Sequence, residues 1–230
     1  MRAGGAGRYG RFVMPAWDRW IAVGFAIGSV CFFIGPFPGF QQLVGPGADG
    51  VVFFAGSIFF TLAAGLALRE ATLSRGSRWG SDPSWWSAAI QFVGTLLFNL
   101  STFDAMQEGL STSQENRLTW APDVFGSAAF LLSGLLAYRV ATGPHLLRPI
   151  RRDRPWRMAA VNLAGCVFFG ISAVASYVVP SSGSVLDLAA ANWTTALGAA
   201  CFFAGALMLL SISSHRGEAV PASSGNDRSR

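Results

Sequence analysis

The stretch Gly28-Ser29-Val30-Cys31-Phe32 lies in the middle of an apolar run and returns in similar form five more times along the 230-residue chain. Each copy is a glycine, a small residue, two apolar residues and a phenylalanine. The copies begin at Gly28, Gly56, Gly94, Gly126, Gly165 and Gly198 and end at Phe32, Phe60, Phe98, Phe130, Phe169 and Phe202. One copy lies near the centre of each hydrophobic segment, so the motif indicates a repeated architecture.

The composition is that of a protein in lipid. The chain is 52% hydrophobic and 13% charged, whereas soluble domains carry about 25% charged residues. A chain of this length holds about six spans of roughly 20 residues. We expect spans at 20–37, 51–68, 85–103, 124–140, 158–179 and 193–210. The sequence therefore predicts an all-α integral membrane protein with six transmembrane helices.

The arginines set the predicted orientation. The chain has 17 Lys and Arg residues, all of them Arg. In a six-span arrangement every arginine except Arg117 falls on one side, and the positive-inside rule makes that side cytoplasmic. Both termini are then cytoplasmic. A basic start before an apolar run is also typical of a signal peptide, but the segment Gly35–Gly39 offers no small-residue cleavage site.

Two successive spans form the repeating unit. Trp20, Trp86 and Trp156 precede the motif glycines of the odd spans by eight or nine residues. A unit of two spans keeps its orientation from copy to copy, which makes a parallel repeat. The predicted organisation is a cytoplasmic basic N-terminus at 1–19, hairpin repeats at 20–75, 76–142 and 143–210, and a disordered cytoplasmic tail at 211–230.

The spacing of the motif predicts helix packing. Residues i and i+4 share one face of a helix, so the glycine opens a notch one turn from the phenylalanine. Helices in lipid associate by close approach and side-chain packing, because no hydrophobic force brings them together. We expect each phenylalanine to fill a notch on a neighbouring helix.

Four polar residues are candidates for a polar site. Gln91 and Asn162 stand three residues before their motif glycines, where the first repeat has Phe25. Asn99 and Asp104 lie toward the outer end of the third span. Polar side chains inside spans are costly and often functional. One interpretation is a polar site shared between hairpins. The alternative is interhelical hydrogen bonding for the amides and a solvated interfacial carboxylate for Asp104.

Several chemistries are excluded or unsupported. Without lysine no retinal or pyridoxal Schiff base forms. Cys31, Cys166 and Cys201 lie inside spans with no Cys/His cluster, so the sequence indicates no metal site and no disulfide framework. His145 and His215 lie outside the spans, which excludes bis-histidine haem in the bilayer. We predict no catalytic residues, cofactor or metal.

The segments Trp20–Gly35, Trp86–Phe103 and Trp156–Ser176 share a tryptophan ahead of the span and a mid-span glycine, small residue and phenylalanine. In these features they resemble the YrhK-like family of two-span bacterial membrane modules. The resemblance implies several copies of such a module. No activity is established for that family, so no functional residue is carried over from it.

The sequence predicts partners more readily than activity. The cluster at 151–157 and the other arginine-rich segments are expected to contact anionic lipid headgroups rather than nucleic acid. An Arg-, Ala- and Gly-rich composition favours a bacterial plasma membrane. We predict a non-enzymatic protein that packs with itself as a homo-oligomer or with a membrane-protein partner. The alternative is a small-solute or ion transporter or channel with its path at the repeat interface.

Overall fold

The computed structural model describes residues 17–74, 81–143 and 154–218. Six long helices account for most of them: α1 (Trp17–Ile34), α3 (Pro46–Ser74), α4 (Pro83–Asp104), α6 (Ala121–Thr142), α7 (Arg154–Ala175) and α8 (Leu188–Glu218). The connections carry α2 (Pro38–Val44), α5 (Thr112–Gln114), the π-helix η1 (Glu115–Trp120) and the strands β1 (Val178–Val179) and β2 (Ser184–Val185). The two strands pair antiparallel.

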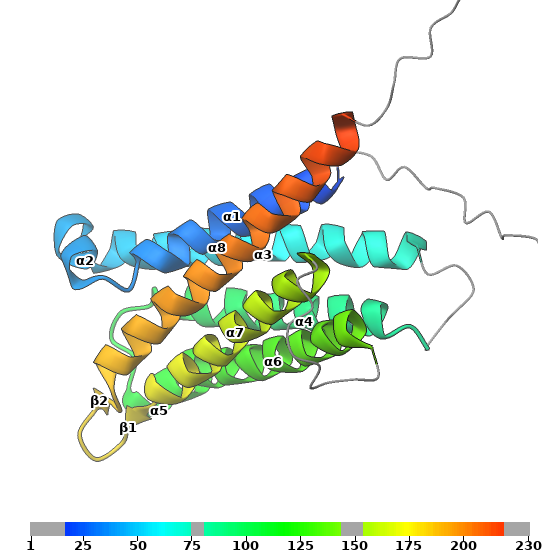
Figure 1. The fold of residues 1–230 in the computed structure, drawn as a ribbon. Coiled ribbons are helices and arrows are strands. Elements are labelled where there is room, and N and C mark those ends of the chain that lie inside the picture. Colours follow the sequence, from blue (N-terminus) through cyan, green and yellow to red (C-terminus); the bar gives the residue numbers. More distant parts are fainter. Residues whose placement is uncertain (1–16, 75–80, 144–153, 219–230) are drawn as a thin grey trace, which may run out of the picture.

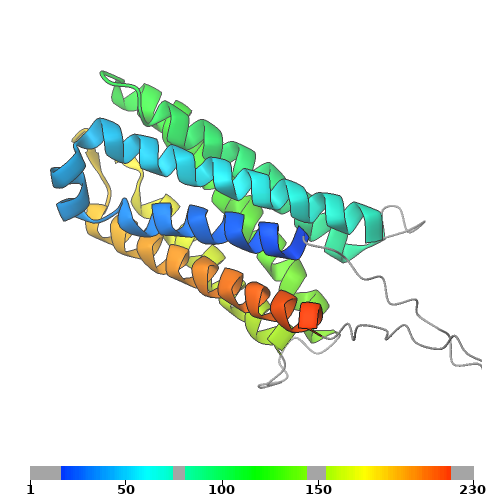
Figure 2. The same cartoon turned by 90° about the horizontal axis from the view of Figure 1, so that it is seen from above.

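The six long helices form a closed ring. Following the chain, α1 packs on α3, α3 on α4, α4 on α6, α6 on α7, α7 on α8, and α8 on α1. All run along one bundle axis, as Figure 1 and Figure 2 show, and the start of α1 and the end of α8 lie at the same end. The other end carries α2, α5 and the β-hairpin. This closure gives the bundle an axis around which residues from all six helices meet.

Five helical segments are long and apolar enough to cross a membrane, among the residues that the structure describes. They are Trp17–Ile34, Pro46–Ser74, Thr112–Thr142, Arg154–Ala175 and Leu188–Ser211. The prediction of a helical, multi-pass membrane protein is thereby confirmed. The sixth long helix, α4, is less apolar because it carries Gln91, Asn99, Ser101 and Thr102. The count of six crossings stays a prediction.

Each motif glycine faces the motif phenylalanine of the helix paired with it. A Cβ atom placed on Gly28 would lie 2.6 Å from Cδ2 of Phe60, and one on Gly56 would lie 3.1 Å from Cδ2 of Phe32. The same reciprocal contact between a glycine and the partner helix's phenylalanine joins α4 to α6 and α7 to α8. The remaining contacts are Gly94 with Phe130, Gly126 with Phe98, Gly165 with Phe202, and Gly198 with Phe169.

The six phenylalanines meet at the centre of the ring. Each is only 4–5% exposed, and together they make up most of one buried cluster. Phe32, Phe98 and Phe169 form a triangle with ring centroids 5.7–6.3 Å apart in edge-to-face arrangements, which is the favoured geometry for aromatic pairs. Since α1, α4 and α7 each supply one ring of the triangle, it ties the three helix pairs together.

The small residue after each motif glycine lies between helix pairs. These residues are 0–2% exposed: Ser29, Ser57, Thr95, Ser127, Cys166 and Ala199. Ser57 Oγ lies 2.9 Å from Thr102 Oγ1 across α3 and α4. Ser127 Oγ donates a hydrogen bond to the Phe169 carbonyl across α6 and α7 at 3.4 Å. The motif therefore packs one helix against both of its neighbours.

Several predicted boundaries are corrected by the structure. The fifth span ends at Ala175 rather than at residue 179, because Val178 and Val179 pair as β1 in a turn that Gly183 closes with φ 65°. The protein is thus not purely helical. The expected tail at 211–230 is helical as far as Glu218. The predicted disorder of 219–230, and the N-terminal segment 1–16, lie outside the described residues.

The glycine notches predict a sharp stability effect. In Gly94→Ala the new Cβ would lie 2.7 Å from Phe130 and 3.1 Å from the Gly126 carbonyl oxygen. Overpacking of this kind costs about 1–3 kcal/mol. Thermal unfolding in detergent should show a lower midpoint. Gly170→Ala in α7 is the matched control, since nothing lies within 4 Å of its Cβ position. Equal midpoints for the two variants would contradict the packing described above.

Candidate functional site

Two cavities lie at opposite ends of the helix ring. The first occupies about 410 Å³ and is lined by residues that include Ser101, Glu115, Trp120, Asp123 and Asn192. We call it the acidic vestibule, and it lies at the end that carries α2, α5 and the β-hairpin. The second occupies about 590 Å³ at the other end, and its lining includes Phe25, Gln91, Asn162 and Phe202. We call it the amide vestibule.

The phenylalanine cluster separates the two vestibules. Phe32, Phe98 and Phe169 line the acidic vestibule, and Phe202 lines the amide vestibule. The gap between the rings in the cluster holds only about 10 Å³. A water molecule needs at least about 10–15 Å³ and several polar partners. Apart from Ser57, phenylalanine rings line this gap, so the cluster is an apolar barrier between two chambers whose linings mix polar and apolar side chains.

One register rule describes the lining of both vestibules. The residues three places before the motif glycines of α1, α4 and α7 are Phe25, Gln91 and Asn162, and all three line the amide vestibule. The corresponding residues of α3, α6 and α8 are Phe53, Asp123 and Thr195. All of these line the acidic vestibule. The first helix pair supplies phenylalanine at both ends, so the polar groups at this register come from the second and third pairs.

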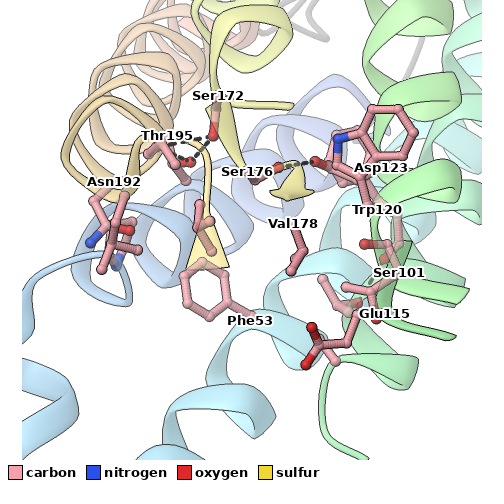
Figure 3. A pocket seen from close by; sticks show the side chains of 18 of the residues that line it. Phe53, Ser101, Glu115, Trp120, Asp123, Ser172, Ser176, Val178, Asn192 and Thr195 are labelled. Carbon is pink, nitrogen blue, oxygen red and sulfur yellow. Dashed lines mark hydrogen bonds between the residues drawn. The ribbon is translucent and has the colours of Figure 1, made fainter. Parts of the chain in front are cut away.

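Hydrogen bonds hold the α6 wall of the acidic vestibule against α7. Trp120 Nε1 donates to the Ala173 carbonyl at 2.8 Å, and the Trp120 ring meets Tyr177 edge-to-face at 4.9 Å between centroids. Ser176 Oγ donates to Asp123 Oδ2 at 3.5 Å, as Figure 3 shows. The indole and the carboxylate are therefore both held in place at the cavity wall.

The π-helix places this wall. Ser111 and Gln114 form a capping box at the start of α5, and η1 continues without a break into α6. Pro122 cannot donate a backbone hydrogen bond and crowds the preceding turn. The wider turn of η1 accommodates it, and the Ala121 N–H bonds the Asn116 carbonyl five residues back. Turns of this kind are frequent at functional sites.

The wall of the cavity formed by α7 and α8 carries two hydroxyl groups that lie within hydrogen-bond distance of each other. Ser172 Oγ lies 2.6 Å from Thr195 Oγ1 and donates to the Ala191 carbonyl at 3.0 Å. Asn192 lies beside this pair on α8, and Figure 3 places it across the cavity from Glu115 and Asp123. The two walls differ in character: carboxylates on α6 and η1, neutral polar groups on α7 and α8.

The structure brings together two of the four predicted polar residues. Gln91 and Asn162 share the amide vestibule. Asn99 lies between α4 and α3, where Thr61 Oγ1 donates to its Oδ1 at 3.2 Å. Asp104 ends α4 and accepts a hydrogen bond from Gln107 Nε2. Neither Asn99 nor Asp104 lines a vestibule.

Sequence reasoning missed the acidic residues that line a cavity. The repeat contains a signal for Asp123, because it stands three residues before Gly126 as Gln91 stands three residues before Gly94. Asp123 also directly follows Trp120-Ala121-Pro122, which is typical of an ordinary helix start. Glu115 carried no such signal, since its position depends on η1. The part of the chain that the structure describes holds no group of three or more His, Cys, Asp or Glu side chains arranged to bind a metal.

Comparisons with protein-family models, curated proteins and solved structures found no match. The resemblance to YrhK-like modules therefore stays a prediction.

The vestibules predict a pattern of thiol reactivity. In a background with Cys31, Cys166 and Cys201 replaced by alanine, Asn162→Cys and Asn192→Cys should react with a small charged thiosulfonate, because water reaches both chambers. Leu132→Cys is the control: its side chain is half exposed on the outer face of α6, where lipid excludes a charged reagent. Reaction at Leu132→Cys with no reaction at the other two sites would show that the chambers are closed to water.

Proposed function

We propose that all six long helices cross a bacterial plasma membrane as three tandem two-helix repeats with both termini in the cytoplasm. The glycine and phenylalanine exchange within every helix pair supports a repeated unit. The start of α1 and the end of α8 lie at one end of the ring, which supports an even number of crossings. Arginines concentrated at that end would face cytoplasmic anionic lipid.

Thiol labelling in whole cells tests this topology, again without the native cysteines. Glu108 and Ser84 are both exposed and lie at opposite ends of α4. Glu108→Cys should react with an impermeant maleimide in intact cells, and Ser84→Cys only after permeabilisation. The reverse pattern would invert the orientation. Labelling of both from outside would remove α4 from the set of spans.

We further propose that the protein is a transporter for a small solute and has no catalytic role. The observation that carries this proposal is the pair of cavities at opposite ends of one axis, each with a few polar groups in a mostly apolar lining and divided by the phenylalanine cluster. Polar groups that face an internal cavity in a membrane protein mark substrate pathways by default.

A packing role alone gives a weaker account of this geometry. If the helices only needed to associate, a bundle with filled ends would be more stable, because a cavity loses dispersion contacts. Gln91, Asn162 and Asp123 instead face open space. The role as an interaction protein or homo-oligomer stays a prediction, and crosslinking in membranes that captures only lipid would count against it.

In this proposal the phenylalanine cluster is the closed gate. Phe32, Phe98 and Phe169 meet on the axis, and no solute passes while they touch. Each ring rests on a glycine of its partner helix. This seat fixes each ring within its own helix pair, whereas the contacts between pairs are ring to ring. Opening would thus separate the rings while the helix pairs remain joined.

Flux into liposomes tests the pathway. Purified protein should give saturable uptake of at least one member of a panel of small cationic, neutral and anionic solutes, above that of empty liposomes. Phe98→Ala with Phe169→Ala should add an unsaturable leak of about tenfold or more, because the barrier loses two of its three axial rings. Phe125→Ala is the matched control, since Phe125 is 66% exposed on the outer face of α6. No wild-type flux for any solute would refute the transport proposal.

A further inference from the structure

The acidic vestibule has two carboxyl groups in its lining. Glu115 and Asp123 both line the cavity and are both half-buried. None of the described residues that line it is Arg or His. Arg117 belongs to the same π-helix but is exposed and does not line the cavity. Carboxylates in a cavity attract cations and repel anions.

A third carboxylate lies at the same depth. Asp49 stands seven residues before Gly56, and the corresponding residues of α6 and α8, Thr119 and Ala191, both line the acidic vestibule. Asp49 itself is 7% exposed, and its Oδ1 has no hydrogen-bond partner within the described ranges. It lies at that end of the axis without lining the cavity.

Beside the carboxyl, hydroxyl and amide groups, the lining carries much aromatic and aliphatic surface. Trp120, Phe53 and the axial ring triangle provide aromatic surface, and Val178, Val185 and Leu188 provide aliphatic surface. An ammonium group gains about 0.5–2 kcal/mol from an aromatic face, most from tryptophan. A hard metal ion instead requires six or more oxygen ligands or several waters. The cavity therefore suits a cation that carries its own apolar surface.

From these features we infer that the acidic vestibule is a binding site for a small organic ammonium ion. Asp123 and Glu115 supply the charge, Trp120 supplies an aromatic face, and the hydroxyl and amide groups of Thr195 and Asn192 contact a polar substituent. The cavity of about 410 Å³ is in the range of small-molecule sites. The inference rests on the proposed function in that it names the solute class, but binding is measured separately from transport.

The fixed indole supports the same assignment. The hydrogen bond from Trp120 Nε1 to the Ala173 carbonyl and the contact with Tyr177 hold the ring beside Asp123. A site in which the aromatic face and the carboxylate are already positioned loses little entropy when the ligand binds. The hydrogen bond that Ser176 Oγ donates to Asp123 Oδ2 is long, at 3.5 Å. The carboxylate therefore remains available to a ligand.

Calorimetry on the purified full chain tests the inference. The protein is kept in an uncharged maltoside detergent, so that no lipid headgroup competes, and titrated with choline and with its neutral isostere 3,3-dimethyl-1-butanol. Choline should bind saturably and at least about tenfold more tightly than the isostere. Asp123→Asn and Glu115→Gln should each weaken choline binding by about tenfold, and Trp120→Phe by a few-fold. Glu108→Gln, an exposed carboxylate outside the cavity, should leave it unchanged.

Each contrary result has a distinct meaning. Equal affinity for the isostere, unchanged choline affinity in both carboxylate variants, or displacement of choline by Mg²⁺ at lower concentration would overturn the inference. So would absence of choline binding by protein that elutes as a single folded species. Choline binding without flux would uphold the site and refute transport. Saturable flux of a neutral solute with no choline binding would uphold transport and refute the ammonium site.

Discussion

The reciprocal contact between a glycine on one helix and a phenylalanine on its partner underlies the rest of this structure. In the hydrocarbon interior apolar side chains gain nothing by leaving lipid, so helices stay together only where their surfaces fit closely. A Cβ on Gly28 or Gly94 would lie within 3 Å of a phenylalanine ring, which shows how close the fit is. Because the exchange runs in both directions within each helix pair, the two helices are fixed in register as well as in contact.

That register has consequences along the whole axis. With the six glycines at one level, the phenylalanines fall about one turn from it toward one end or the other, and the residues three places before each glycine fall at a similar distance on the opposite side. The first helix pair places Phe25 and Phe53 there, and the later pairs place Gln91, Asp123 and their counterparts. A single packing motif thus produces a sealed centre and two chambers with polar groups in their linings. The chambers are unequal because the three pairs differ at those places.

The deviations from regular structure gather at the acidic end. The π-helix η1, the interior proline of the helix 112–142 and the short β-hairpin all lie there. Asn116 joins two of them, since its amide donates to the Val178 carbonyl at 2.7 Å and accepts from the Val178 N–H at 3.1 Å. The described residues at the other end belong to regular helices. Irregular backbone at membrane depth is tolerated where it lines a cavity or is buried in protein, which is its setting here.

The sequence by itself indicated the membrane setting, the helices and the packing of phenylalanine against glycine, because these follow from apolar run length and from the rule that residues i and i+4 share a helix face. The same rule placed Gln91 and Asn162 at one depth. Only the tertiary structure decided that α8 closes the ring on α1, that Asn99 bonds Thr61 rather than facing the axis, and that Glu115 reaches the cavity. Those features depend on how each helix is rotated and which helix stands beside it, and contacts between distant segments set both.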